Sequence, residues 1–178
     1  MRSYTPIHYA NAYFHTPILP RTVGQPTFDK LRAFKKALNT NTESVQSDIG
    51  GGTFGHLGLV LDDTKYYDLT GHHYIRPLHP EALVVVAGTA HHEAVRLREE
   101  HAENIRLFRE TIDVDIALMK QIVSAIGSDY TKELRNDITN TITRPIDETL
   151  TFLFKRCGFV HSERLRMEEQ KVQKFPGI

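Results

Sequence analysis

The stretch TAHHEAVRLREEHAENIRLFRETIDVDIALMKQIVSAI, residues 89–126, contains neither proline nor glycine. Its large apolar residues recur at steps of three and four, which fits the 3.6-residue period of a helix and not the two-residue period of a strand. We therefore predict one long helix, buried by its neighbours along a single apolar face. The residues of that predicted face are Ile105, Phe108, Ile112, Ile116, Met119, Val123 and Ile126.

The first half of the predicted helix is more charged than the second. Arginines and glutamates alternate over residues 91–110, with Arg96 four residues before Glu100 and Arg106 four residues before Glu110. Pairs at this spacing stabilise a helix by only about 0.3 kcal/mol each, because water screens them. We expect this half to be largely solvated.

A shorter helix is predicted to begin after Thr27, whose hydroxyl suits the N-cap position. Apolar residues then follow at helical spacing for about three turns. They are Phe28, Leu31, Phe34 and Leu38. A polar loop over residues 39–47 is predicted to end this helix, and a glycine-rich loop follows at residues 50–55.

The segment between the glycine-rich loop and the long helix is harder to assign. Asp62 or Asp63 is placed to cap a short helix that contains Tyr66 and Leu69. The apolar runs at residues 56–61 and 83–86 are too short for periodicity to separate a buried helical turn from a strand. One of these two runs is a candidate strand.

Helices are also predicted after residue 126. Gly127 and Ser128 stop the long helix and begin another, in which Tyr130, Leu134, Ile138 and Ile142 recur every four residues until Pro145. Thr143 is expected to cap the next helix, which Gly158 ends, and residues 162–174 form a last amphipathic helix. The inward residues of the helix before Gly158 are expected to be Ile146, Leu150, Leu153, Phe154 and Cys157.

The predicted fold is therefore all-α: a multi-helix orthogonal bundle with one long central helix. Residues 1–25 hold Pro6, Pro17 and Pro20 among aromatic side chains and are predicted to be an irregular N-terminal arm, followed by a helical domain over residues 26–178. The arm's Tyr9, Tyr13 and Phe14 are too apolar for a solvated tail, so they are candidate self-association residues.

Composition and net charge indicate which classes of function the protein can have. The 178 residues are 40% apolar and 25% charged, as in folded domains, and 22 basic residues balance 22 acidic ones. A net charge of zero creates no global attraction to nucleic acid or to a membrane, and it permits self-association. The single cysteine favours a reducing compartment, and no run approaches the roughly 18 apolar residues of a membrane span. We expect a cytoplasmic protein.

The glycine-rich loop matches a dinucleotide-binding pattern, G-x-G-x-x-G, over residues 50–55. That pattern binds a pyrophosphate only where a buried strand leads into the loop and a helix N-terminus follows it. Residues 43–49, ESVQSDI, do not resemble such a strand. We therefore interpret these glycines as a structural turn.

Histidine-rich positions are candidates for a metal site. The helical zinc-hydrolase signature needs two histidines four residues apart with a glutamate after the first, yet His92-Glu93 is followed by Arg96 at the second ligand position. Solvated or hydrogen-bonded histidines are the default interpretation. The clustered histidines are His72, His73, His79, His91, His92 and His101.

No other motif points to catalysis. Cys157 shares the apolar face of its predicted helix, which favours a buried, inert thiol. Residues 155–174 carry a small excess of basic side chains, and Arg164, Arg166 and Lys171 are candidates for weak nucleic-acid contact. We expect no enzymatic activity, no cofactor, no metal and no small-molecule substrate.

Several blocks, taken in order, resemble the N-terminal part of Gag-like polyproteins of copia-type LTR retrotransposons. They are VGQPT (23–27), LNTNTESV (38–45), GGG (50–52) before GHLGL (55–59), RP (76–77), HAE (101–103), LRN (134–136) and residues 150–158. The resemblance implies a helical capsid lobe without catalytic residues, which assembles with itself into a shell enclosing RNA. Such relatives continue where this sequence ends at residues 175–178, as expected if it is a truncated or domesticated copy.

Two alternatives remain open from the residues alone. The first is a helical nucleic-acid-binding module that uses the basic C-terminal face. The second is a metal hydrolase that depends on the clustered histidines.

Overall fold

The computed structural model describes residues 24–156. This part of the chain is mostly helical and contains no strand, apart from one isolated antiparallel bridge between Arg135 and Ile142. The predicted all-α class is confirmed, and neither of the two ambiguous apolar runs, residues 56–61 and 83–86, is a strand. The irregular arm, Cys157, Gly158 and the last predicted helix lie outside the described residues.

Helix α1 spans Phe28–Ser44 and begins as predicted, since the Thr27 hydroxyl accepts a hydrogen bond from the Lys30 amide. It ends later than predicted, because the polar stretch after Leu38 is helical and not a loop. Asn41 and Thr42 are buried there with partners: Asn41 donates to the Gln121 side chain at 2.9 Å, and Thr42 donates to the Leu38 carbonyl. These hydrogen bonds allow polar side chains to continue a buried helix.

The glycine-rich segment forms turns, as predicted. Gly50, Gly51 and Gly52 all have positive φ in and after the short 3₁₀ helix η2 (Ile49–Gly51), and the Tyr66 hydroxyl donates to the Gly50 carbonyl at 2.9 Å. A second 3₁₀ turn, η3 (Leu57–Leu59), occupies the first ambiguous apolar run. Helix α2 (Asp63–Thr70) follows, with Asp62 as its N-cap.

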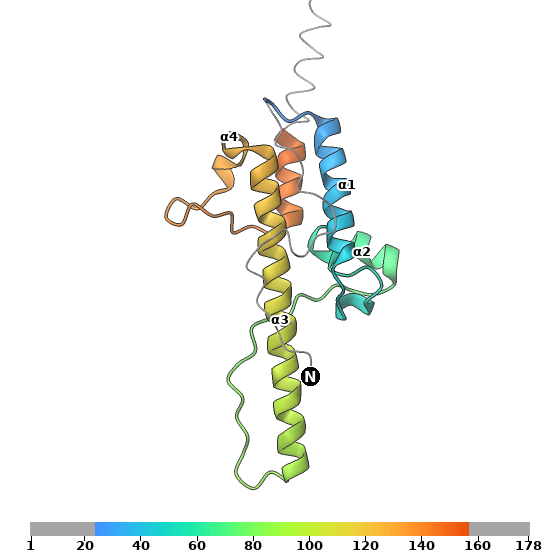
Figure 1. Ribbon diagram of the computed structural model, residues 1–178, viewed down its shortest axis with the longest axis vertical. Helices are drawn as coiled ribbons and strands as arrows, with labels where there is room; N and C mark the ends of the chain where they lie inside the picture. Colours follow the sequence, from blue (N-terminus) through green and yellow to red (C-terminus); the bar gives the residue numbers. More distant parts are fainter. Residues whose placement is uncertain (1–23, 157–178) are drawn as a thin grey trace, which may run out of the picture.

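Residues 71–90 form a strap without a helix or strand. Figure 1 shows this strap, in green, running beside the half of α3 that extends beyond the other helices and turning back into it near residue 88. The second ambiguous apolar run lies in the strap, where Val84 is 79% exposed. Tyr74 at the start of the strap is buried and belongs to the core, whereas the apolar run at residues 83–86 lies at the surface.

Helix α3 spans His91–Ile126, 36 residues, and confirms the predicted central helix. Of the predicted buried face only Ile126 is buried: Ile112 and Ile116 are 38% and 48% exposed, and the other four residues are partly buried. The reason is that α3 carries two apolar stripes, and the stripe with smaller residues permits closer approach of neighbouring helices. The buried residues in the second half are Thr111, Val114, Ala117, Leu118, Gln121, Ile122, Ala125 and Ile126.

The chain after α3 departs from prediction. Helix α4 (Ser128–Thr131) and η4 (Lys132–Leu134) are helical, but the predicted helix does not continue to Ile142. The Asn136 side-chain oxygen accepts the amides of Ile138 and Thr139, so local side-chain hydrogen bonds replace helical ones. Residues 135–144 form an exposed loop instead, and Ile138 is 93% exposed.

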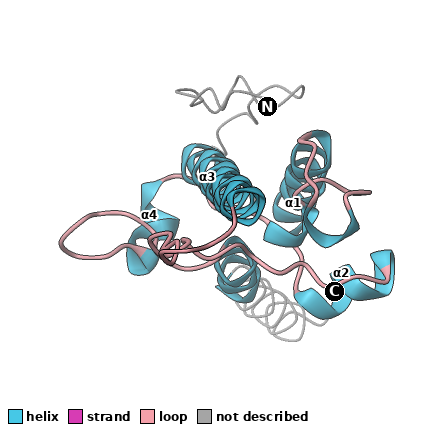
Figure 2. Ribbon diagram, turned by 90° about the horizontal axis from the view of Figure 1, so that it is seen from below, coloured by secondary structure: helices cyan, strands magenta, loops and turns pink. Residues whose placement is uncertain are grey.

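The last described helix covers residues 146–156. The Thr149 amide donates to the Pro145 carbonyl, so Pro145 and not Thr143 precedes its first turn. Its Ile146, Leu150 and Leu153 are buried, as predicted. Figures 1 and 2 show this helix beside α1 and the second half of α3. The core lies among these three helices. Its residues include Leu31, Phe34 and Leu38 of α1 and Leu118 and Ile122 of α3.

Within residues 24–156, no helix is long and apolar enough to cross a bilayer.

Candidate functional site

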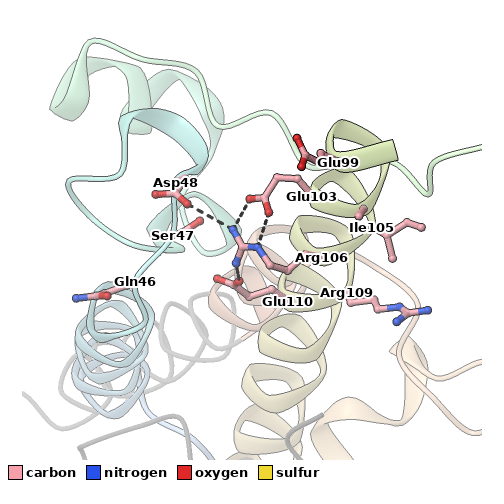
Figure 3. A pocket seen from close by; sticks show the side chains of 10 residues that line it. Gln46, Ser47, Asp48, Glu99, Glu103, Ile105, Arg106, Arg109 and Glu110 are labelled. Carbon is pink, nitrogen blue, oxygen red and sulfur yellow. Dashed lines mark hydrogen bonds and ion pairs between the residues drawn. The ribbon is translucent and has the colours of Figure 1, made fainter. Parts of the chain in front are cut away.

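A polar groove of about 990 Å³ lies between the segment that follows α1 and the first half of α3. Figure 3 shows its side chains, with Asp48 on one wall and Arg106 on the other. Both walls carry acidic groups. The lining residues are Gln46, Ser47, Asp48, Glu99, Ala102, Glu103, Ile105, Arg106, Arg109 and Glu110.

Arg106 is the central charge of this groove. Its guanidinium donates to Glu103 at 2.6 and 2.9 Å, to Glu110 at 2.7 Å and to Asp48 at 3.5 Å. The hydrogen bond to Glu103 is the main reason that the pKa of Arg106 is raised and that of Glu103 is lowered. Three carboxylates therefore already occupy the donors of this arginine.

A buried histidine extends the network beneath the groove. His56 is fully buried: its Nε2 lies 3.2 Å from Glu110 Oε1, and its Nδ1 lies 2.8 Å from the Tyr74 hydroxyl. Burial raises the pKa of Tyr74, so this hydroxyl keeps its proton and can donate to Nδ1. When the Tyr74 hydroxyl donates to Nδ1, Nε2 is the ring nitrogen that donates to Glu110, so both ring nitrogens have partners.

This network joins three separate segments of the chain: the glycine-rich segment, the strap and α3. Each of its charged members has a partner within the protein. Arg109, the other arginine of the groove, points away from Arg106 in Figure 3. The arrangement is that of a structural cross-link that shapes a groove, because its carboxylates and guanidinium bind one another.

A second cavity, which we call the basic pocket, has a volume of about 400 Å³. It lies between the second half of α3 and residues 135–145, and Arg76 of the strap also lines it. We call its aliphatic lining side chains the floor and its basic lining side chains the rim. The rim includes Arg76, Lys120, Arg135 and Arg144, and the floor includes Ile116, Met119, Val123 and Ile142.

Charges in the basic pocket are unbalanced. Asp115 is the only carboxylate that lines it, and it pairs with Arg76 at 2.8 Å. Burial raises the pKa of Asp115, and the Arg76 charge opposes that shift. Arg135 donates to the Asn140 carbonyl, but its buried Nε has no hydrogen-bond partner within residues 24–156. The pocket thus combines an apolar floor with an excess of cations.

Three floor residues, Ile116, Met119 and Val123, belong to a longer apolar feature, the outer stripe of α3. We define the outer stripe as Ile105, Phe108, Ile112, Ile116, Met119 and Val123, none of which is buried. The strap covers it only in part, by the edge-on contact of the His79 and Phe108 rings and the Arg76–Asp115 ion pair. Within the outer stripe, Ile112 and Ile116 are exposed and open to contact with another molecule, and the other four residues are partly buried.

The site residues predicted from sequence are not brought together by the described structure. Tyr9, Tyr13, Phe14, Arg164, Arg166 and Lys171 all lie outside residues 24–156. Among the clustered histidines, His101 is partly exposed and the other five are exposed. The described residues contain no group of three or more His, Cys, Asp or Glu side chains placed to hold a metal ion.

Sequence reasoning missed the basic pocket and the His56 network. One signal for the first was available, because Val114, Leu118 and Ile122 form a second helical series within the long helix. Two apolar series on one helix indicate either burial on both sides or an exposed stripe. No comparable signal marked His56, whose partners lie 18 and 54 residues away.

Comparison of the chain with protein families, with curated proteins and with solved structures found no match.

Proposed function

We propose that this chain is a non-enzymatic structural protein whose helical domain associates with further copies of itself. The observation that carries the proposal is the outer stripe of α3. Ile112 and Ile116 are 38% and 48% exposed on the central helix of the fold, and the chain's own strap leaves them uncovered. Exposed apolar stripes of this kind are typical of surfaces that bind another protein.

The charged groups support the same proposal. In the polar groove, Arg106 binds Glu103 and Glu110, and Glu110 also contacts His56, so these groups stabilise the fold around α3. A zero net charge also permits close approach of identical copies.

The resemblance to Gag-like polyproteins suggests what such association serves. We propose a capsid-like role, in which copies form a shell around RNA in the cytoplasm, the reducing compartment that a single cysteine favours. Lattices of this type rest on several modest interfaces. The chain therefore needs exposed contact surfaces and no reactive centre.

Self-association is tested by sedimentation velocity and negative-stain microscopy over a range of protein and salt concentrations. We expect a sedimentation coefficient that rises with concentration, and ordered particles or filaments at high concentration. A strict monomer at millimolar concentration under every condition would overturn the proposal.

The role of the outer stripe is tested with the double variant I112S/I116S. Both side chains are exposed, so folding is expected to be retained while self-association weakens by about tenfold. Val84→Ser is the control, since it removes an exposed apolar side chain from the strap, outside both the outer stripe and the basic pocket. Equal weakening by the control would show that the outer stripe is not the contact surface.

A further inference from the structure

We propose that the basic pocket of one copy binds helix α2 of a second copy, head to tail. This inference rests on the proposed self-association and names the two surfaces that meet. It is argued from the chemistry of the pocket, the chemistry of α2 and the positions of both in the fold.

The pocket sets two requirements for an occupant. Lys120 and Arg144 have no ion pair within residues 24–156, so the rim calls for negative charge. The aliphatic floor, which includes the half-exposed Ile116, calls for apolar side chains. A bare phosphate would satisfy the rim and leave the floor in water, whereas an acidic protein surface with exposed apolar residues satisfies both.

Helix α2 has these two properties. The segment from its N-cap to its last residue contains Asp62, Asp63 and Asp68 against the single cation Lys65. Asp62 pairs with Lys65 and Asp63 with His73, so Asp68 is the carboxylate of α2 without an ion pair among residues 24–156. Tyr67 and Leu69 are 46% and 51% exposed. Asp68 stands about 200° around the helix from the buried Tyr66, so it lies on the solvent face between these two apolar side chains.

The two surfaces cannot meet within one molecule. Figures 1 and 2 show α2 on one side of the α1–α3 core and the loop at residues 135–144 on the other. Pairing between copies therefore uses a different surface on each partner and leaves one pocket and one α2 free at the ends. Such heterologous contacts close into rings or extend into open chains, so they can link more than two copies.

Two charge-reversed variants test the pairing. The pocket variant K120E/R144E makes the rim acidic, and the helix variant T64K/D68K makes the solvent face of α2 basic. All four positions are exposed, and none has an ion pair within the described residues. Each variant alone brings like charges together at the proposed contact, so its self-association is expected to weaken by at least about tenfold at low salt.

The equimolar mixture of the two variants is the decisive sample. The acidic pocket of one faces the basic helix of the other, while the remaining basic pocket faces the remaining acidic helix. We expect sedimentation velocity to show association restored to within about threefold of the unaltered protein, weakening as salt is added. Failure of the mixture to recover, when each variant alone is impaired, would overturn the pairing.

Controls separate this inference from the proposed function. R98E and E81K reverse exposed charges away from both surfaces and are expected to leave association unchanged. If the unaltered protein never associates, self-association fails as a whole. If the protein associates and both reversed variants associate equally well, only the pocket–α2 contact is wrong.

A second experiment tests RNA, the other macromolecule that basic residues attract. Binding of a fluorescent single-stranded RNA is measured by anisotropy for the unaltered protein and K120E/R144E. We expect the pocket variant to bind RNA as the unaltered protein does. Loss of RNA binding together with unchanged self-association would assign the pocket to RNA and overturn the pairing.

Discussion

His56 shows how one residue can hold three segments of a chain together. Its two ring nitrogens bind Tyr74 and Glu110, and no part of its side chain is exposed. The variant His56→Phe fills the same space but leaves a hydroxyl and a carboxylate without their partner. We expect a loss of about 2–4 kcal/mol in the free energy of unfolding, measured by urea denaturation.

His73→Phe is the matched control for this prediction. His73 also binds a carboxylate, Asp63 at 2.7 Å, but its side chain is 60% exposed. Water can replace that partner, so we expect a change below about 0.5 kcal/mol. Similar losses for both variants would contradict a special role for the buried histidine.

Gly55 occupies a position that only glycine can fill. Its φ is +51°, and an added Cβ would lie 2.2 Å from the Val45 carbonyl oxygen. Gly71 has a similar φ of +71° with open space around it. Asparagine tolerates this backbone region, so Gly71→Asn should cost less than about 1 kcal/mol while Gly55→Asn should cost more than about 3 kcal/mol. Thermal unfolding of both variants measures the difference.

Glu103 links stability to pH. Its hydrogen bond with Arg106 lowers the pKa of this carboxyl in the folded protein. An acid with a lowered folded-state pKa stabilises the fold at neutral pH, and that contribution is lost as pH falls through the folded-state value. Because the side chain is half exposed, we expect less than about 1 kcal/mol, lost between about pH 5 and pH 3.

Urea denaturation at pH 7 and pH 3 checks this effect. Glu103→Gln should show a smaller acid-induced loss of stability than the unaltered protein, whereas Glu99→Gln on the same groove should not differ from it. A Glu103→Gln variant with the full acid-induced loss would contradict the assignment.

At the scale of elements, α3 has one apolar stripe that packs in the core and another that faces the surface. Leu118 is fully buried on the core side, and Ile116, two residues earlier, is 48% exposed on the outer stripe. We expect Leu118→Ala to reduce the free energy of unfolding by about 2–5 kcal/mol and Ile116→Ala by less than about 1 kcal/mol. Equal losses in urea denaturation would mean that both stripes belong to the core.

Element boundaries could be predicted where local signals decide them. The Thr27 cap and the proline-free stretch before Gly127 fixed the start of α1 and the extent of α3, because capping and periodicity act within a few residues. The face that α3 buries could not be predicted, since it depends on which stripe its neighbours approach. The loop at residues 135–144 was missed because a four-residue apolar spacing masked the local hydrogen bonds of Asn136.

At the scale of the whole molecule, α3 is unevenly supported. Within its first 20 residues only Ala94 is buried, whereas eight of the remaining residues are buried. Residues 91–104 should therefore exchange amide hydrogens at least about tenfold faster than residues 114–126. Hydrogen exchange followed by mass spectrometry measures this contrast, and uniform protection along α3 would show that another surface covers the first half.

The candidate sites could be predicted only in part, because their residues come from distant segments of the chain that meet only in the folded molecule. Lys120 lies on a helix, Arg76 in the strap and Arg144 in a loop, and the sequence carries no mark that these three will converge. The exposed outer stripe, by contrast, was present in the apolar spacing of α3 and was assigned to the wrong environment. Local sequence patterns predict individual helices. A site built from distant segments can be recognised only once the fold is known.

The turn at Gly88 has a practical consequence. It lies where the strap joins the unsupported end of α3, and a helix of 36 residues rises by about 54 Å between that turn and Gly127. A fluorescent protein or an epitope inserted at residue 88 would lie beside the N-terminal end of α3, away from the packed helices. Any particle built from such fusions would display its cargo at a spacing dictated by the protein's own architecture.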